Sequence, residues 1–122
     1  MTAPHVLLVD DQKSNLEITQ AVFEGAGAVT TAIQDPEEAF RMVKANMKSF
    51  DMVLIDIHMP KMDGQTLAKN LREAGYDRAI VAFTAHPTMK GKRAGEEHIN
   101  HFLNKTTLKV DLVKAILDQY CS

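Results

Sequence analysis

The sequence contains a single cysteine, little net charge and no apolar stretch long enough to span a membrane. Cys121 has no second thiol with which to form an internal disulfide, which is typical of proteins from a reducing compartment. The formal net charge of -2 gives no indication of binding to nucleic acid or to a membrane surface. The N-terminus enters an apolar run directly, without a signal-peptide pattern. We therefore expect a cytoplasmic protein that contacts neither nucleic acid nor membrane.

The length and composition are those of one globular domain. The chain has 122 residues, of which 45% are apolar and 25% charged, and this is enough to enclose a hydrophobic core. No linker, internal repeat or low-complexity tract interrupts it. We therefore expect a single domain over residues 1–122.

Four short apolar runs each end in residues that carry a reactive polar group: a carboxylate, a hydroxyl or an ammonium. Runs of this length, bounded by turn residues, indicate strands buried on both faces, as in a parallel sheet. A carboxylate in the middle of such a strand would be costly to desolvate, but at the carboxyl end it can face a crevice. The residues at these strand ends are Asp10, Asp11, Asp56, Thr84 and Lys105.

Between the strands, apolar residues recur at helical spacing. Helices are predicted over about residues 14–25, 36–47, 64–74 and 110–120, with a further strand over 28–33. Ser14 or Asn15 is the expected cap of the first helix, Asp35 followed by proline is a strong start for the second, and Gly75 is the expected end of the third. Residues 86–100 predict only a short, weak helix, because each of its two glycines costs about 1 kcal/mol relative to alanine.

The alternation of strand and helix, five times over, predicts an α/β fold with a doubly wound parallel sheet. For five strands the common order is 2-1-3-4-5, the flavodoxin-like (βα)5 arrangement, whose crevice opens between strands one and three. Asp10, Asp11 and Asp56 follow those two strands. The topology alone therefore predicts that the three acids meet.

Three neighbouring carboxylates repel one another unless a cation is present, and their oxygens suit Mg²⁺. Aspartate is a known covalent carrier of phosphoryl groups, which makes Asp56 the candidate nucleophile. Lys105 can pair with the transferred oxygens, and the Thr84 hydroxyl can hydrogen-bond the same group. The alternative interpretation of Asp56, taken alone, is a cap of the turn that follows it.

With these residues the whole chain resembles the receiver domains of two-component signalling, found in response regulators and hybrid histidine kinases. The matching pieces are Val9-Asp10-Asp11, Asp56 with Met59-Pro60 and Met62-Asp63-Gly64, Thr84-Ala85, and Lys105. The resemblance implies that Asp56 is the phosphoacceptor and that Asp10, Asp11, Asp56 and the carbonyl of His58 bind Mg²⁺. It implies, too, that Thr84 and Phe102 form a conformational switch. The stretch after Thr84 is most similar to receivers of phosphorelays and hybrid kinases.

Two features depart from the family pattern. Thr106 stands where receivers usually carry proline after the lysine, and a cis bond before a non-proline residue costs roughly 2.5–4 kcal/mol, so we expect a trans peptide. The segment 87–100 also lacks the usual family pattern before the fifth strand. His58 and His86 lie two residues beyond the acceptor and the switch hydroxyl. They are either exposed loop residues or groups that tune the lifetime of the phosphoryl group.

The leading hypothesis is a phosphorelay receiver that takes a phosphoryl group from a histidine kinase or a histidine phosphotransfer protein. It would be either a stand-alone regulator or a receiver excised from a longer hybrid kinase, since no output domain follows the last predicted helix. The alternative is a degenerate receiver that acts as a phosphorylation-independent binding module. A Mg²⁺-dependent phosphohydrolase ranks lower, because such enzymes usually place a second acid where His58 stands.

Overall fold

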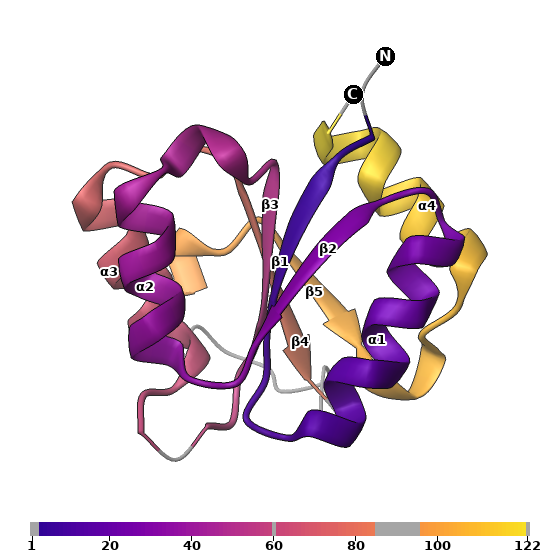
Figure 1. Ribbon diagram of the computed structural model, residues 1–122, viewed down its shortest axis with the longest axis horizontal. Helices are drawn as coiled ribbons and strands as arrows, with labels where there is room; N and C mark the ends of the chain where they lie inside the picture. The colour runs from indigo at the N-terminus through magenta and orange to yellow at the C-terminus, as the bar shows by residue number, and fades with distance from the viewer. Residues whose placement is uncertain (1–2, 60, 85–95, 122) are drawn as a thin grey trace.

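The computed structural model describes residues 3–59, 61–84 and 96–121 and shows one parallel sheet with helices on both faces (Figure 1). The strands are β1 (His5–Val9), β2 (Val29–Ile33), β3 (Met52–Asp56), β4 (Ala79–Thr84) and β5 (His101–Asn104). Their order is β2-β1-β3-β4-β5, and every neighbouring pair is parallel. The predicted doubly wound α/β fold and its strand order are confirmed.

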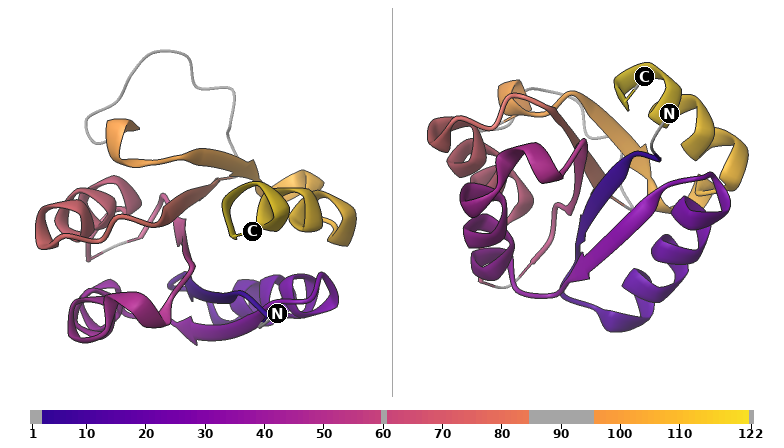
Figure 2. Two further views of the ribbon diagram at one scale, coloured as in Figure 1. Left: turned by 90° about the horizontal axis from the view of Figure 1, so that it is seen from above. Right: turned by 45° about the horizontal axis from the view of Figure 1, so that its top comes forward.

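The described helices α1 to α4 lie in pairs on the two faces of the sheet (Figure 2). One layer holds α1 (Lys13–Gly25) and α4 (Val110–Cys121), and the other holds α2 (Pro36–Ala45) and α3 (Gly64–Ala74). Three 3₁₀ turns complete the described elements: η1 (Met47–Ser49), η2 (Glu96–His98) and η3 (Lys105–Thr107). Most of the weak helix predicted over 86–100 lies outside the described residues, and η2 is the part described. None of the described helices is both long and apolar enough to cross a lipid bilayer.

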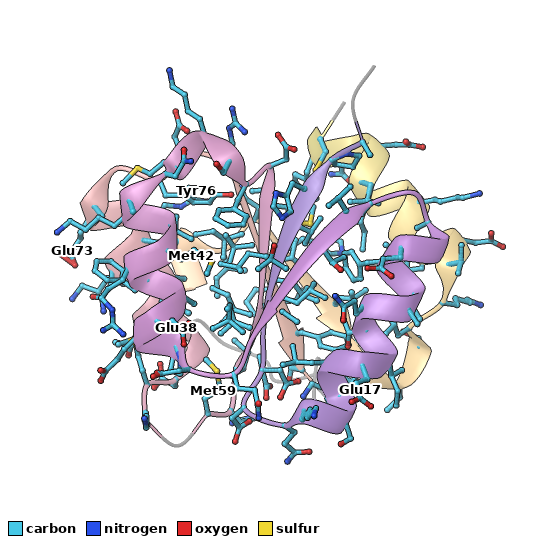
Figure 3. All side chains as sticks on the ribbon, in the orientation of Figure 1. Glu17, Glu38, Met42, Met59, Glu73 and Tyr76 are labelled. Atoms are coloured by element: carbon cyan, nitrogen blue, oxygen red, sulfur yellow. The ribbon has the colours of Figure 1, made fainter. Side chains whose placement is uncertain are left out.

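The core consists of two layers separated by the sheet. Successive strand residues point to opposite faces, so Val6 and Leu8 pack toward α1 and α4 while Leu7 and Val9 pack toward α2 and α3. All positions of β3 and β4 are buried, as expected for central parallel strands. The Tyr76 side chain lies in the core layer between the sheet and helices α2 and α3 (Figure 3). In the central strands β3 and β4, a polar side chain can therefore face a crevice only at a strand end.

Helix ends follow the sequence signals in two cases and depart from them in one. Asp35 caps α2 by accepting a hydrogen bond from the Glu37 N–H at 3.0 Å, as predicted. Gly75 ends α3 with φ 107°, a left-handed conformation that favours glycine. The predicted cap of α1 is wrong, because the helix begins at Lys13 and the extended residue before it is Gln12, which makes no side-chain capping bond.

Candidate functional site

The three predicted acids meet at the carboxyl edge of the sheet, the lower edge in Figure 1. In the register of β1 against β3, Val9 lies beside Ile55, so Asp10, which follows β1, and Asp56, the last residue of β3, lie side by side. Asp11 joins them, and one carboxylate oxygen from each of the three lies within 4.8 Å of the others. Asp10 and Asp56 are buried, and Asp11 is half-buried. The arrangement is thus a partly enclosed cluster of carboxylates.

Backbone contacts hold the two acids that follow β1. The Asp10 carboxylate accepts a hydrogen bond from the Gln12 N–H at 3.0 Å, a turn in which the side chain replaces a backbone acceptor. The Asp10 N–H donates to the Ile33 carbonyl at 3.2 Å. On the next residue, the Asp11 carbonyl accepts from the Gln34 side chain at 3.1 Å. Hydrogen bonds within the loop after β1, and from this loop to the end of β2, therefore hold the loop in place.

The end of β3 is held by a close approach of α3. The Gly64 N–H donates to the Ile57 carbonyl at 3.0 Å, and a Cβ at Gly64 would lie 2.6 Å from the Asp56 carbonyl oxygen. Only a residue without a side chain fits against the strand end. Asp63 caps the helix by accepting from the Thr66 N–H at 2.8 Å. Asp56 therefore sits at a strand end fixed by the start of the following helix.

Lys105 points into the acid cluster. Its Nζ lies 3.1 Å from Asp56 Oδ1 and 3.5 Å from Asp10 Oδ2, and its side chain is 21% exposed. The ammonium group also lies 5.4 Å from the centre of the Phe83 ring, within range of a cation–π contact. No cis peptide bond occurs among the described residues, so the lysine reaches the site along a trans backbone.

The electrostatics of the cluster suit a bound cation. Burial raises the pKa of Asp10 above its ordinary value, and repulsion from Asp56 adds to this, while the Gln12 N–H and Lys105 oppose it. Within the described part of the chain, the buried Asp10 Oδ2 has an ion pair with Lys105 but no hydrogen-bond partner. Three carboxylates with one unsatisfied buried oxygen fit a hard divalent cation such as Mg²⁺.

Of the other predicted site residues, Thr84 and His58 lie beside this cluster, whereas Phe102 lies further back in β5, paired with Ala82 of β4. Thr84 ends β4 at the same edge and is buried, and the His58 N–H donates to Asp56 Oδ1 at 3.3 Å while the residue itself is exposed. Phe102, in β5, is 39% exposed. His86 lies outside the described residues, so its predicted place beside the site stays a prediction.

Two neighbours of Lys105 escaped the sequence analysis. Asn104 Oδ1 accepts from both the backbone N–H and the hydroxyl of Thr106, at 2.9 and 2.8 Å, and so forms the turn where receivers usually have proline. An asparagine two residues before a threonine is a recognisable turn signal, so this feature was predictable. The contact between the Phe83 ring and the Lys105 ammonium was not predictable, because the two residues are 22 positions apart and only the fold brings them together.

Comparison with known proteins identifies the family of the chain. The model of the response regulator receiver domain family matches residues 6–117. The chain is 33% identical over 121 residues to the sensor protein GacS of Pseudomonas syringae pv. syringae, covering 94% of this chain and 13% of GacS. It is 30% identical over 114 residues to the two-component response regulator ARR22 of Arabidopsis thaliana, covering 92% of this chain and 80% of ARR22.

A solved structure shows the same fold. The receiver domain of a sensor histidine kinase from Pseudomonas aeruginosa, which has a magnesium ion coordinated in its active site cleft, superposes with a TM-score of 0.83. It is 24% identical and the match covers 98% of each chain. The chain therefore belongs to the response regulator receiver domain family, a component of two-component and phosphorelay signalling. It spans only a small part of the sensor kinases that it matches.

Proposed function

We propose that the chain is a phosphoacceptor, in which Asp56 takes a phosphoryl group from a histidine of a kinase or phosphotransfer protein. The observation that carries this proposal is the position of Lys105 Nζ, 3.1 Å from Asp56 Oδ1, beside two further carboxylates. A lysine and three acids gathered at one strand edge serve no packing purpose that apolar residues would not serve better. They do match the requirements of phosphoryl transfer, in which positioning and charge neutralisation dominate.

Asp10, Asp11 and Asp56, with the backbone carbonyl of His58, would hold Mg²⁺. When bound, this ion supplies positive charge to the oxygens of the transferred group. An Asp56 carboxylate oxygen forms the bond to phosphorus as the bond from phosphorus to the donor imidazole nitrogen breaks, and the electron pair stays on that nitrogen. Lys105 pairs with a phosphoryl oxygen.

Release of the phosphoryl group would follow by hydrolysis. Water attacks phosphorus as the phosphorus–oxygen bond to Asp56 breaks, the electron pair stays on the Asp56 carboxylate, and the oxygen and both protons of the water leave as part of dihydrogen phosphate. His58 is exposed immediately after the acceptor strand, where it can affect the approach of water. Replacement of His58 by alanine should change the half-life of the phosphorylated protein. An unchanged half-life would show that His58 is an exposed loop residue without a role in hydrolysis.

Phosphorylation of Asp56 would be read out by Thr84 and Phe102. Thr84 is buried at the carboxyl edge, whereas the Phe102 side chain is 39% exposed on β5. A hydroxyl that turns toward the phosphoryl group vacates space into which the aromatic ring can move. Because the sequence has no tryptophan, Phe102→Trp would be a unique fluorophore. Addition of beryllofluoride and Mg²⁺ should shift its emission to the blue, but not in a variant that also carries Asp56→Asn.

The direct test of the acceptor uses a small phosphodonor. Phosphoramidate carries a phosphorus–nitrogen bond like that of phosphohistidine, and uptake is measured by intact-protein mass spectrometry with Mg²⁺ present. The parent should gain one phosphoryl group, and Asp56→Asn should gain none. Asp63→Asn is the matched control, because asparagine caps a helix as well as aspartate does. Label on Asp56→Asn equal to that on the parent would refute the assignment.

The same assay separates the competing functions. A parent protein without any mass gain would favour the phosphorylation-independent binding module. Steady release of phosphate from many donor molecules, at rates typical of enzymes, would favour a phosphohydrolase.

A further inference from the structure

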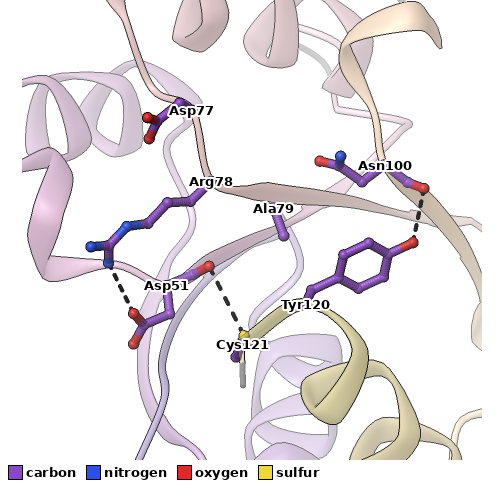
Figure 4. A pocket seen from close by; sticks show the side chains of 7 residues that line it. All are labelled: Asp51, Asp77, Arg78, Ala79, Asn100, Tyr120 and Cys121. Atoms are coloured by element: carbon purple, nitrogen blue, oxygen red, sulfur yellow. Dashed lines mark hydrogen bonds and ion pairs between the residues drawn. The ribbon is translucent and has the colours of Figure 1, made fainter.

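Asn100, directly before β5, is tied to three other elements at the edge of the sheet opposite the acid cluster. Its N–H donates to the Ile80 carbonyl at 2.8 Å, and its Oδ1 accepts from the Ile80 N–H at 2.8 Å. The same Oδ1 accepts from Arg72 Nη2 at 2.7 Å. Its carbonyl accepts from the Tyr120 hydroxyl at 3.1 Å, as Figure 4 shows. Asn100 therefore joins β4, α3 and α4 to the start of β5.

The Arg72 guanidinium makes several further hydrogen bonds at this edge of the sheet. Besides its bond to Asn100, its Nε donates to the His98 carbonyl at 3.1 Å, and its Nη1 donates to the carbonyls of Tyr76 and Arg78 at 2.8 and 2.7 Å. Hydrogen bonds from a charged guanidinium are stronger than neutral ones and fix direction. We call Arg72, Asn100 and Ile80 the Arg72 clamp.

The strand that the clamp holds has little else to set its register. β5 is an edge strand of four residues, and Leu103 is its only buried side chain. Register is strongly specified where a strand buries one whole face, and weakly specified where it does not. In β4, by contrast, every position is buried. The polar contacts at Asn100 therefore compensate for the small apolar surface of β5.

The register of β5 matters because Lys105 follows the strand directly. Asn104 pairs with Thr84 at the carboxyl end of β5, and the next residue places its ammonium 3.1 Å from Asp56 Oδ1. We propose that Arg72 is a positioning residue for phosphoryl transfer, which acts through Asn100 to fix β5 and so to hold Lys105 against Asp56. This inference rests on the proposed function.

The experiment compares Arg72→Met with Arg78→Met. Arg78 lies at the same edge and also donates hydrogen bonds, to the carbonyls of Lys48 and Phe50 and to the Asp51 carboxylate, but within the described part of the chain none of its side-chain hydrogen bonds reaches β5. Both variants should lose stability. At a temperature where circular dichroism shows both folded, Arg72→Met should take up phosphoryl groups about tenfold more slowly, since small misplacements of reacting groups have effects of this order. Arg78→Met should stay within about twofold of the parent, because a loss of stability alone leaves the folded site unchanged.

The decisive comparison adds Arg72→Met to a protein that already carries Lys105→Met. If Arg72 acts through Lys105, adding Arg72→Met to Lys105→Met should slow phosphorylation no further. A tenfold loss that persists without Lys105 would overturn the proposal, as would an Arg72→Met protein as fast as the parent. A parent that takes up no label refutes the proposed function instead.

A second pair of variants covers the case in which Arg72→Met does not fold. Asn100→Asp keeps an oxygen acceptor for Arg72 and Ile80, whereas Asn100→Ala removes it, so only the alanine variant should be slow. Amide hydrogen exchange without Mg²⁺ gives a readout independent of activity. The Leu103 and Asn104 amides should exchange faster in Asn100→Ala than in Asn100→Asp, and equal exchange in the two would refute the role of the clamp.

Discussion

Gly64→Ala should slow phosphorylation of Asp56 out of proportion to its effect on stability. The added Cβ would lie 2.6 Å from the Asp56 carbonyl oxygen and 3.0 Å from Ile55 Cγ2, whereas ordinary contact begins at 3.4 Å. Helix α3 and the end of β3 must therefore separate by about 0.8 Å, the difference between 3.4 and 2.6 Å. Overpacking of this kind typically costs about 1–3 kcal/mol, partly offset by the higher helix propensity of alanine.

The displacement falls on the residue that carries the acceptor carboxylate. Because a shift of about 1 Å can reduce a rate about 100-fold, and the separation is shared between helix and strand, we expect a loss of at least about tenfold. Gly75→Ala is the matched control. At φ 107° its Cβ costs about 1–2 kcal/mol, yet its nearest neighbours are Met47 atoms at 3.8 and 3.9 Å, far from Asp56.

Urea titration and intact-mass phosphorylation kinetics, run on both glycine variants, give the comparison. Both should lose comparable stability, and only Gly64→Ala should lose rate. A Gly64→Ala protein that is phosphorylated within about twofold of the parent rate would refute the close-approach argument.

Two further predictions follow from burial. Without Mg²⁺ at pH 7, Asp10→Asn should be more stable than the parent by on the order of 1 kcal/mol, the scale of one buried unsatisfied polar atom. Because burial raises the folded-state pKa of Asp10, the parent loses stability as pH rises through that pKa, so the difference in urea titrations should vanish below the unfolded value of 3.8. A difference that is independent of pH would contradict this. Burial also raises the pKa of Cys121 to about 11, so about one thiol in three thousand is ionised at pH 7.5, and iodoacetamide should modify the folded protein hundreds of times more slowly than the urea-unfolded chain. Equal rates in the two states would exclude a protected thiol.

The fold could be predicted from sequence because its signals are local and agree with one another. Continuous apolar runs marked β3 and β4 as central strands, and Asp35-Pro36 and Gly75 marked helix ends that the structure confirms. The parallel order then followed from the alternation of strands and helices. The cap of α1 failed because Ser14 and Asn15, both good caps, fall inside the first turn, where Gln12 precedes the helix without a capping bond.

The acid cluster could be placed for the same reason, whereas the supporting contacts could not. Asp10 and Asp56 follow strands that the topology makes neighbours, so their meeting depends on strand order alone. The contact between Phe83 and Lys105, and the bond from Arg72 to Asn100, join residues more than twenty positions apart through the packing of separate elements. No local pattern indicates such pairs, since they depend on where α3 and β5 come to rest.

The two edges of the sheet therefore carry opposite kinds of polar contact. At the amino edge, the Arg72 guanidinium and the Asn100 side chain find hydrogen-bond partners on neighbouring elements. At the carboxyl edge, a buried Asp10 oxygen has no hydrogen-bond partner among the described residues, and burial raises the pKa of this acid, so its ionised form is unfavourable in the folded state. If the proposed function holds, Mg²⁺ and a phosphoryl group would relieve that energy, and the relief would give them a differential interaction with which to shift the conformation of the domain. A carboxyl edge with every polar atom satisfied would be more stable and would have less to gain from either ligand.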